Sequence, residues 1–128
     1  VAVRRQRQMC IRDRAYSRDI LKEAENVAAE MNIHVVKGIY AGLSGPTLET
    51  PAEYMYVRNI GADAVGMSTV PEVIAARHMG IPCFGVSVIT DLGVPGKIVE
   101  VTHEDVQKVA SKAELILTKM VKQLFERL

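Results

Sequence analysis

Hydrophobic residues recur every three or four positions in two segments of the chain, one near each end. The first segment is predicted to form a helix that Ser17 caps and that runs through Met31, with its apolar residues on one face. The second is a long helix that Thr102 opens, with Asp105 three residues later. Its apolar stripe consists of Val106, Val109, Ala113, Ile116, Met120, Leu124 and Leu128.

Between these helices, β-branched and apolar runs alternate with further helical segments. Strands are expected at 33–41, 64–67 and 82–90, and helices at 51–59 and from Val70 or Pro71 to Met79. The third strand is uniformly apolar, which is typical of a strand covered on both faces. This alternation predicts an α/β fold with a largely parallel or mixed central sheet flanked by helices.

Two of the expected strand-to-helix junctions carry similar signals. Thr50 with Glu53, and Thr69 with Glu72, have the spacing of capping boxes, each with a proline near the helix start. Glu49 precedes the first signal, and Met67 with Ser68 precedes the second. Asp91 follows the third strand. Ligands of parallel sheets bind beyond the carboxyl ends of the strands, so we expect these residues to converge on one edge and form a pocket.

Composition limits the class of protein. The 128 residues suffice for one domain, and a hydrophobic content of 48% with 24% charged residues is typical of a globular protein. No apolar run approaches the roughly 20 residues of a membrane span, and no signal-peptide pattern is present, so no membrane partner is expected. Cys10 and Cys83 are too few for a disulfide framework or a metal site. We therefore expect a reducing, cytoplasmic location.

Charge is concentrated in the first 14 residues. They contain five arginines and one aspartate, a net charge of +4, which leaves −3 for the rest of the chain. This arm lacks aromatic residues and a helical period, so nucleic-acid binding is not expected. Residues 5–13 resemble a translated sequencing-adapter fragment. We therefore expect residues 1–14 to be a non-native basic extension and the fold to begin near Ala15.

The residues at the junctions suit a flat, polar heterocycle that lies beside an anion. Glu49 and Asp91 can accept N–H donors from a base, and Met67 can pack against a ring. Ser68 lies at a helix start, where phosphate binds well. No glycine-rich dinucleotide motif or P-loop motif occurs, which argues against a Rossmann or P-loop site.

Three blocks closely resemble the trimeric purine nucleoside phosphorylases. They are the motif from Gly45-Pro46 through Glu49-Thr50 to Ala52-Glu53, the block Gly61–Glu72, and Ser87-x-Ile89-Thr90. The resemblance spans Ala15 to Leu128 and implies that residues 15–128 are the C-terminal part of a single nucleoside phosphorylase domain, truncated on its N-terminal side. It also implies that the missing part supplies most phosphate ligands, that the complete protein is a homotrimer, and that this chain alone is inactive.

The resemblance further implies a reaction and roles for individual residues. Inorganic phosphate, the co-substrate, would cleave a purine nucleoside to the free base and ribose 1-phosphate, without metal or cofactor. Catalytic roles fall to Glu49, which would hold N1–H and the 2-amino group of a 6-oxopurine, and to Asp91, near N7. The remaining expected contacts are Leu48 with the purine face, Met67 with the ribose, His103 with the 5′-hydroxyl and Ser68 with phosphate.

Asp91 leaves the preferred base open. Many members that act on 6-oxopurines have asparagine there, and an ionised aspartate can only accept hydrogen bonds, as an adenosine or methylthioadenosine phosphorylase requires. A protonated Asp91 could instead donate to N7. Because Glu49 is retained, we expect inosine and guanosine to be preferred. Two other interpretations are a non-catalytic nucleoside-binding fragment and a flavodoxin-like regulatory domain.

Overall fold

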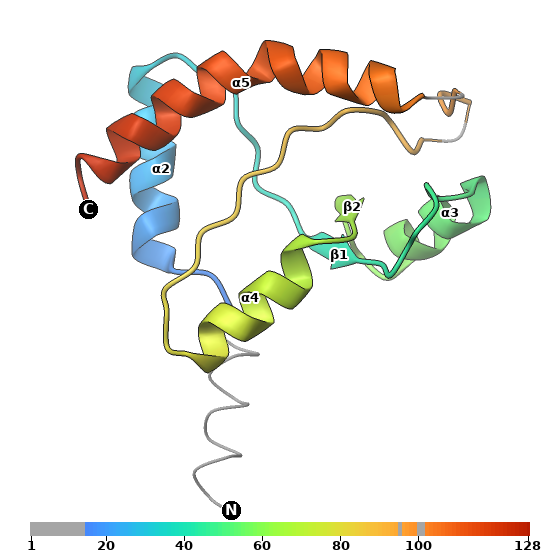
Figure 1. Ribbon diagram of the computed structural model, residues 1–128, viewed down its shortest axis with the longest axis horizontal. Coiled ribbons are helices and arrows are strands. Elements are labelled where there is room, and N and C mark those ends of the chain that lie inside the picture. Colours follow the sequence, from blue (N-terminus) through green and yellow to red (C-terminus); the bar gives the residue numbers. More distant parts are fainter. Residues whose placement is uncertain (1–14, 95, 100–101) are drawn as a thin grey trace, which may run out of the picture.

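Helices dominate the molecule, and a small parallel sheet lies near its centre (Figure 1). The computed structural model describes residues 15–94, 96–99 and 102–128. The expected basic extension, residues 1–14, lies outside this described part. The elements are α2 (Arg18–Glu30), β1 (Tyr40–Gly42), α3 (Pro51–Asn59), β2 (Ala64–Gly66), α4 (Thr69–His78) and α5 (His103–Phe125).

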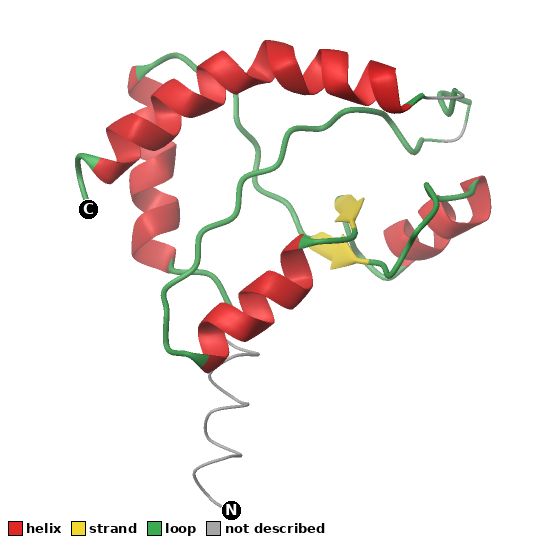
Figure 2. Ribbon diagram, viewed as in Figure 1, coloured by secondary structure: helices red, strands yellow, loops and turns green. Residues whose placement is uncertain are grey.

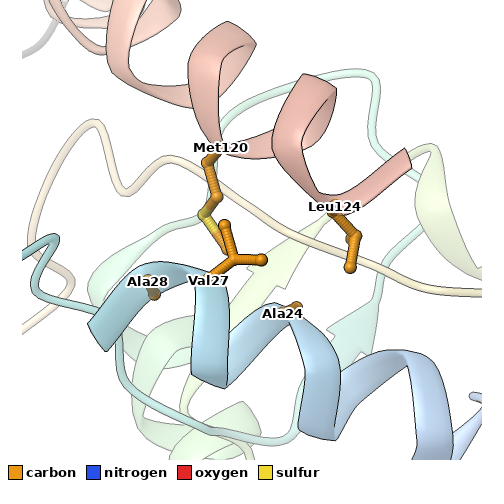
Figure 3. Close-up of a cluster of buried hydrophobic side chains, with 5 residues drawn as sticks. All are labelled: Ala24, Val27, Ala28, Met120 and Leu124. Atoms are coloured by element: carbon orange, nitrogen blue, oxygen red, sulfur yellow. The ribbon is translucent and has the colours of Figure 1, made fainter. Parts of the chain in front are cut away.

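The packed core lies where α2 crosses the C-terminal end of α5 (Figure 3). We call this region the α2–α5 corner; its buried side chains are Ala24, Val27, Ala28, Met120 and Leu124. Small residues on α2 let α5 approach closely, and Met120 and Leu124 lie over them. The apolar stripe predicted for α5 is therefore buried only near its end. Farther toward the start of the helix, Ile116 remains 52% exposed.

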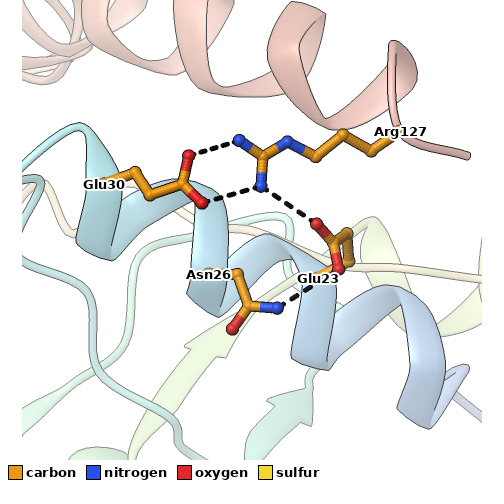
Figure 4. Close-up of polar contacts among 4 residues, drawn as sticks. All are labelled: Glu23, Asn26, Glu30 and Arg127. Atoms are coloured by element: carbon orange, nitrogen blue, oxygen red, sulfur yellow. Dashed lines mark hydrogen bonds and ion pairs between the residues drawn. The ribbon is translucent and has the colours of Figure 1, made fainter.

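An ion-pair cluster closes the outside of the same corner (Figure 4). The Arg127 guanidinium, just after α5, contacts the carboxylates of Glu23 and Glu30 on α2. Its Nη1 lies 3.0 Å from Glu23 Oε1 and 3.1 Å from Glu30 Oε1. The Arg127 side chain, by hydrogen bonding and by charge, lowers the pKa of Glu30. The C-terminal end of the chain is thereby attached to α2.

The sheet consists of β1 and β2, which run parallel (Figure 2). Tyr40 is paired with Ala64 and Gly42 with Gly66. The helix that follows β2, α4, packs across β1: a Cβ atom on Gly42 would lie only 2.8 Å from Val70 Cγ2. Both strands therefore end at the same edge, as the α/β prediction requires.

Two expected strands are largely absent from the described sheet. Of residues 33–41 only Tyr40 and Ala41 join β1, and residues 82–90 form no ladder. Both segments instead run as extended chain between the α2–α5 corner and the sheet (Figure 1). A strand requires a neighbouring backbone to hydrogen-bond with it. No described segment supplies that neighbour, and the expectation that residues 82–90 are covered on both faces is wrong, since Val86 and Ile89 are exposed.

Helix starts agree with the sequence at three of four predicted capping signals, and Ser17 caps α2 as expected. Thr50 with Glu53, and Thr102 with Asp105, form reciprocal capping boxes. The prediction for Thr69 with Glu72 is wrong, because Ser68 is the N-cap of α4 and Thr69 is already inside the helix. The Ser68 side chain makes no capping hydrogen bond.

Candidate functional site

Glu49 is held at the start of α3 by the capping box behind it. Thr50 Oγ1 accepts a hydrogen bond from the Glu53 backbone at 3.3 Å, and Glu53 Oε2 accepts one from the Thr50 backbone at 2.7 Å. The Thr50 backbone and side-chain hydrogen bonds lower the pKa of Glu53, which keeps this half of the box ionised. Glu49 directly precedes this fixed turn. The turn therefore restrains the backbone from which its half-buried side chain projects.

Tyr54 joins α3 to Asp91, a residue 37 positions away. Its hydroxyl donates a hydrogen bond to Asp91 Oδ2 at 3.0 Å, and Thr90 Oγ1 donates one to Asp91 Oδ1 at 2.9 Å. The Tyr54 ring lies against Gly93, where a Cβ atom would come within 2.3 Å of the ring. A glycine is therefore required at position 93 for this contact.

The hydroxyl of Tyr54 lies between two carboxylates. Burial raises its pKa most strongly, followed by the hydrogen bond and the charge of Asp91, and then by Glu49. Each of these effects disfavours a phenolate. Tyr54 thus keeps its proton and donates it to Asp91, with the Glu49 carboxylate nearby. The structure brings these two predicted site residues together, as expected.

The second junction lies against the first. Gly45 has a φ of +64°, and a Cβ atom there would lie 2.0 Å from Met67 Sδ. The Leu43 backbone also donates to the Gly66 carbonyl at 3.0 Å. Both contacts place Met67 beside the loop that leads to Glu49, which agrees with the expected convergence of the two junctions.

The other predicted site residues have no described contact with the Tyr54 hydroxyl. Ser68 is exposed at the N-terminus of α4, and Leu48 is 54% exposed beside Glu49. No contact brings Ser68 to the Tyr54 group within the described residues. His103 is the first residue of α5, and its side chain lies outside the described part of the chain.

Asp91 also borders an open cavity of about 330 Å³. The cavity lies between the segment after residue 90 and the first turns of α5, and it is lined by Thr90, Asp91, Leu92, Lys97, Ile98, Val99, Asp105 and Val109. Apolar side chains form much of its wall. The cavity therefore offers an apolar surface next to the hydrogen-bonding edge of Asp91.

The described residues contain neither a metal-binding cluster nor a helix that could span a membrane. No group of three or more His, Cys, Asp or Glu side chains there could hold a metal ion. Separately, none of the helices in the described part of the chain is both long enough and apolar enough to cross a membrane.

Sequence reasoning missed Tyr54. A signal was nevertheless present, because the residue before an N-cap commonly packs against the fourth residue of the helix. Glu49 and Tyr54 occupy these two positions around Thr50. The pairing is normally apolar, and here it joins a carboxylate to a phenol.

Comparison with known proteins gives one consistent result. The sequence model of a family described as the phosphorylase superfamily matches residues 5–126. Purine nucleoside phosphorylase 1 of Bacillus subtilis is 41% identical over 110 residues, which cover 86% of this chain and 41% of that protein. Purine nucleoside phosphorylase of Bos taurus is 43% identical over 117 residues, covering 86% and 39% of the two chains.

Solved structures agree. The Schistosoma purine nucleoside phosphorylase in complex with hypoxanthine superposes with a TM-score of 0.82 at 38% identity, covering 89% of this chain and 42% of the other. The Schistosoma enzyme in complex with guanosine gives a TM-score of 0.83 at 37% identity, covering 91% and 44%. The chain spans about two fifths of the length of the curated relatives it matches.

Proposed function

Because the chain belongs to the phosphorylase superfamily, we propose that it forms the purine- and ribose-binding part of a purine nucleoside phosphorylase. Residues 15–128 would be the C-terminal part of a single domain in a longer parent protein. That protein would cleave purine nucleosides with inorganic phosphate, releasing the free base and ribose 1-phosphate, as in purine salvage.

One observation supports this proposal most directly. Glu49 and Asp91, the two residues expected to contact the base, both lie at the hydroxyl of Tyr54 although they are 42 positions apart in the chain. Met67, expected to lie under the ribose, contacts the loop that carries Glu49. A surface built in this way has acceptors for the N–H groups of a base and a thioether for the adjoining sugar.

The chemistry follows from where charge develops. Phosphate attacks C1′ while the bond from C1′ to N9 breaks, and the bonding electrons pass to the purine. Glu49 would fix the base through its N–H groups, and Asp91 would accept a hydrogen bond from N7 once that nitrogen has taken a proton from solvent, which stabilises the departing base. Ser68, at a helix N-terminus, would bind the phosphate. This reaction uses no nucleophile of the protein and needs no metal or cofactor.

For the base, 6-oxopurine nucleosides are the preferred substrates in this proposal. Glu49 suits the N1–H of hypoxanthine and guanine, whereas the Schistosoma structures contain both 6-oxopurines and adenosine. The second candidate is adenosine or methylthioadenosine. It is favoured by the two hydrogen bonds that Asp91 accepts from Tyr54 and Thr90, since an accepting carboxylate suits an amino group at C6.

The test is release of base from inosine and from adenosine by the full-length protein, with and without phosphate. We expect phosphate-dependent release of hypoxanthine to be faster. Faster release of adenine would refute the base preference, and release of neither base would refute the proposed activity. The 128-residue chain is expected to be inactive, and hypoxanthine release by that chain would refute this expectation.

Assembly and location are part of the same proposal. The full-length protein would be a homotrimer in the cytoplasm, with purine nucleoside and phosphate as its ligands and no nucleic-acid or membrane partner. Sedimentation equilibrium of the full-length protein tests the trimer, and a monomer or a hexamer would contradict it.

A further inference from the structure

Asp91 accepts a hydrogen bond on each of its carboxylate oxygens. Tyr54 donates to Oδ2 and Thr90 donates to Oδ1, so both partners within the protein are hydroxyl donors. Two hydroxyl donors, one on each oxygen, together fix the orientation of the carboxylate. An ionised carboxylate retains further lone pairs on both oxygens and offers a ligand only acceptors.

The position of the Tyr54 donor is fixed from two sides. Its backbone belongs to the first turn of α3, which the Thr50–Glu53 capping box orders. Its ring lies against Gly93, only two residues beyond Asp91, where a side chain would collide with it. The phenol is therefore held beside Asp91 by packing as well as by its hydrogen bond, and its raised pKa keeps it protonated.

From this geometry we propose that Tyr54 is a positioning residue that sets base preference: its hydroxyl holds the Asp91 carboxylate in the orientation that accepts a hydrogen bond from an amino group at C6. The inference rests on the proposed function and identifies two groups of residues with opposite effects on the choice of base. Glu49 favours a 6-oxopurine, whereas the Tyr54–Asp91 pair favours a 6-aminopurine. Removal of the hydroxyl should therefore strengthen the preference for 6-oxopurines, because Asp91 Oδ2 then loses its partner and the carboxylate is free to turn away from C6.

The experiment compares Tyr54→Phe with the unchanged full-length protein. This variant keeps the ring against Gly93 and deletes only the donor. We expect the ratio of kcat/KM for inosine to kcat/KM for adenosine to rise about tenfold, the effect of one hydrogen bond to a charged group. Tyr56→Phe is the matched control, because Tyr56 lies on the same helix and is 61% exposed; its ratio should not change.

A second substitution separates positioning from a general structural effect. Alanine at position 91 has no carboxylate for the Tyr54 hydroxyl to hold. In an Asp91→Ala background, Tyr54→Phe should therefore change the ratio less than about twofold, so that the two substitutions are strongly coupled. An unchanged ratio in Tyr54→Phe, or an equal change in both backgrounds, would overturn the inference.

Binding of the free bases distinguishes this inference from the proposed function. Hypoxanthine and adenine are titrated calorimetrically into the same full-length variants without phosphate. A shift in relative affinity toward hypoxanthine in Tyr54→Phe supports the inference even if no nucleoside is cleaved, which would refute only the phosphorolysis. An unchanged relative affinity, or no binding of either base, overturns the inference.

Discussion

The α2–α5 corner and the Tyr54 site are stabilised in opposite ways. Five of the seven buried hydrophobic residues of the described chain lie in the corner, where α2 and α5 pack directly. Around the site, Glu49, Tyr54 and Asp91 are only half-buried, and Leu48 and Met67 are largely exposed. The corner depends on apolar packing, whereas the site depends on a helix cap, a few hydrogen bonds and close glycine contacts.

This difference separates stability from recognition. A substitution in the corner should lower the free energy of unfolding and leave the chemistry of the site unchanged. A substitution in the site should alter binding and scarcely affect unfolding, since its residues contribute little buried apolar area. The following substitutions test that separation.

The largest effect is expected from Leu124→Ala. Leu124 is 3% exposed and contacts α2, so its truncation should leave a cavity and lower the free energy of unfolding by about 3 kcal/mol. Urea denaturation followed by circular dichroism measures this change. Leu115→Ala on the same helix is the control, because Leu115 is 72% exposed and should cost less than about 0.5 kcal/mol. Equal losses would show that the corner is not the core.

Glu49→Gln should have the next largest effect, on catalysis. Replacement of the carboxylate weakens charge-assisted hydrogen bonds to the base, and kcat/KM for inosine in the full-length protein should fall about 30-fold, or about 2 kcal/mol. The free energy of unfolding should change by less than about 0.5 kcal/mol. Glu72→Gln, in the first turn of α4, is the control and should retain activity. Loss of stability in place of activity would contradict the separation of the two regions.

Thr50→Ala tests the link between the regions, since it removes a structural contact beside the site. Loss of this N-cap should destabilise the protein by about 1 kcal/mol and also raise KM for inosine, because Glu49 loses its fixed turn. Thr69→Ala is a sharp control: it has the same sequence spacing to a glutamate but no capping role. Similar effects of both substitutions would indicate that Thr69 also caps its helix, which would contradict the structure.

The smallest effect concerns acid stability of the corner. The Arg127 contacts lower the pKa of Glu30 from its ordinary value of 4.5. A carboxylate with a lowered pKa stabilises the fold above that ordinary value, and the contribution is lost as pH falls through the folded-state pKa. Glu30→Gln should therefore reduce the decline in thermal stability below about pH 4.5, whereas Glu114→Gln should not. Identical pH profiles would show that the Arg127 cluster contributes nothing.

Local signals in the sequence predicted much of the fold. The helical period gave α2 and α5, and the Thr50–Glu53 spacing located α3 to the residue. The failures share a cause, since they concern partners that local sequence does not specify. Residues 82–90 have the composition of a strand but no neighbouring strand, and Thr69 lost the cap to the residue before it.

The site divides in the same way. Glu49 and Asp91 each follow a segment of strand-like composition, which predicts that they lie close together, because parallel strands bring their carboxyl ends together. Since residues 82–90 join no ladder, the described link to Asp91 is made by Tyr54 instead. Tyr54 was missed because its role depends on a residue 37 positions away and on the absence of a side chain at Gly93. Neither condition produces a pattern within one helix.

The contact between Gly42 and Val70 has a mechanical consequence. With the contact between Gly45 and Met67, it fastens the loop that carries Glu49 to the helix start that carries Ser68 at two points. The two junctions therefore move as one unit, and a ligand that orders the Glu49 loop also orders the start of α4. We expect phosphate and base to bind with positive cooperativity, each lowering the dissociation constant of the other by the same factor. Calorimetric titration of hypoxanthine into the full-length protein at increasing phosphate concentration measures that factor, and a factor of one would mean that the two junctions move independently.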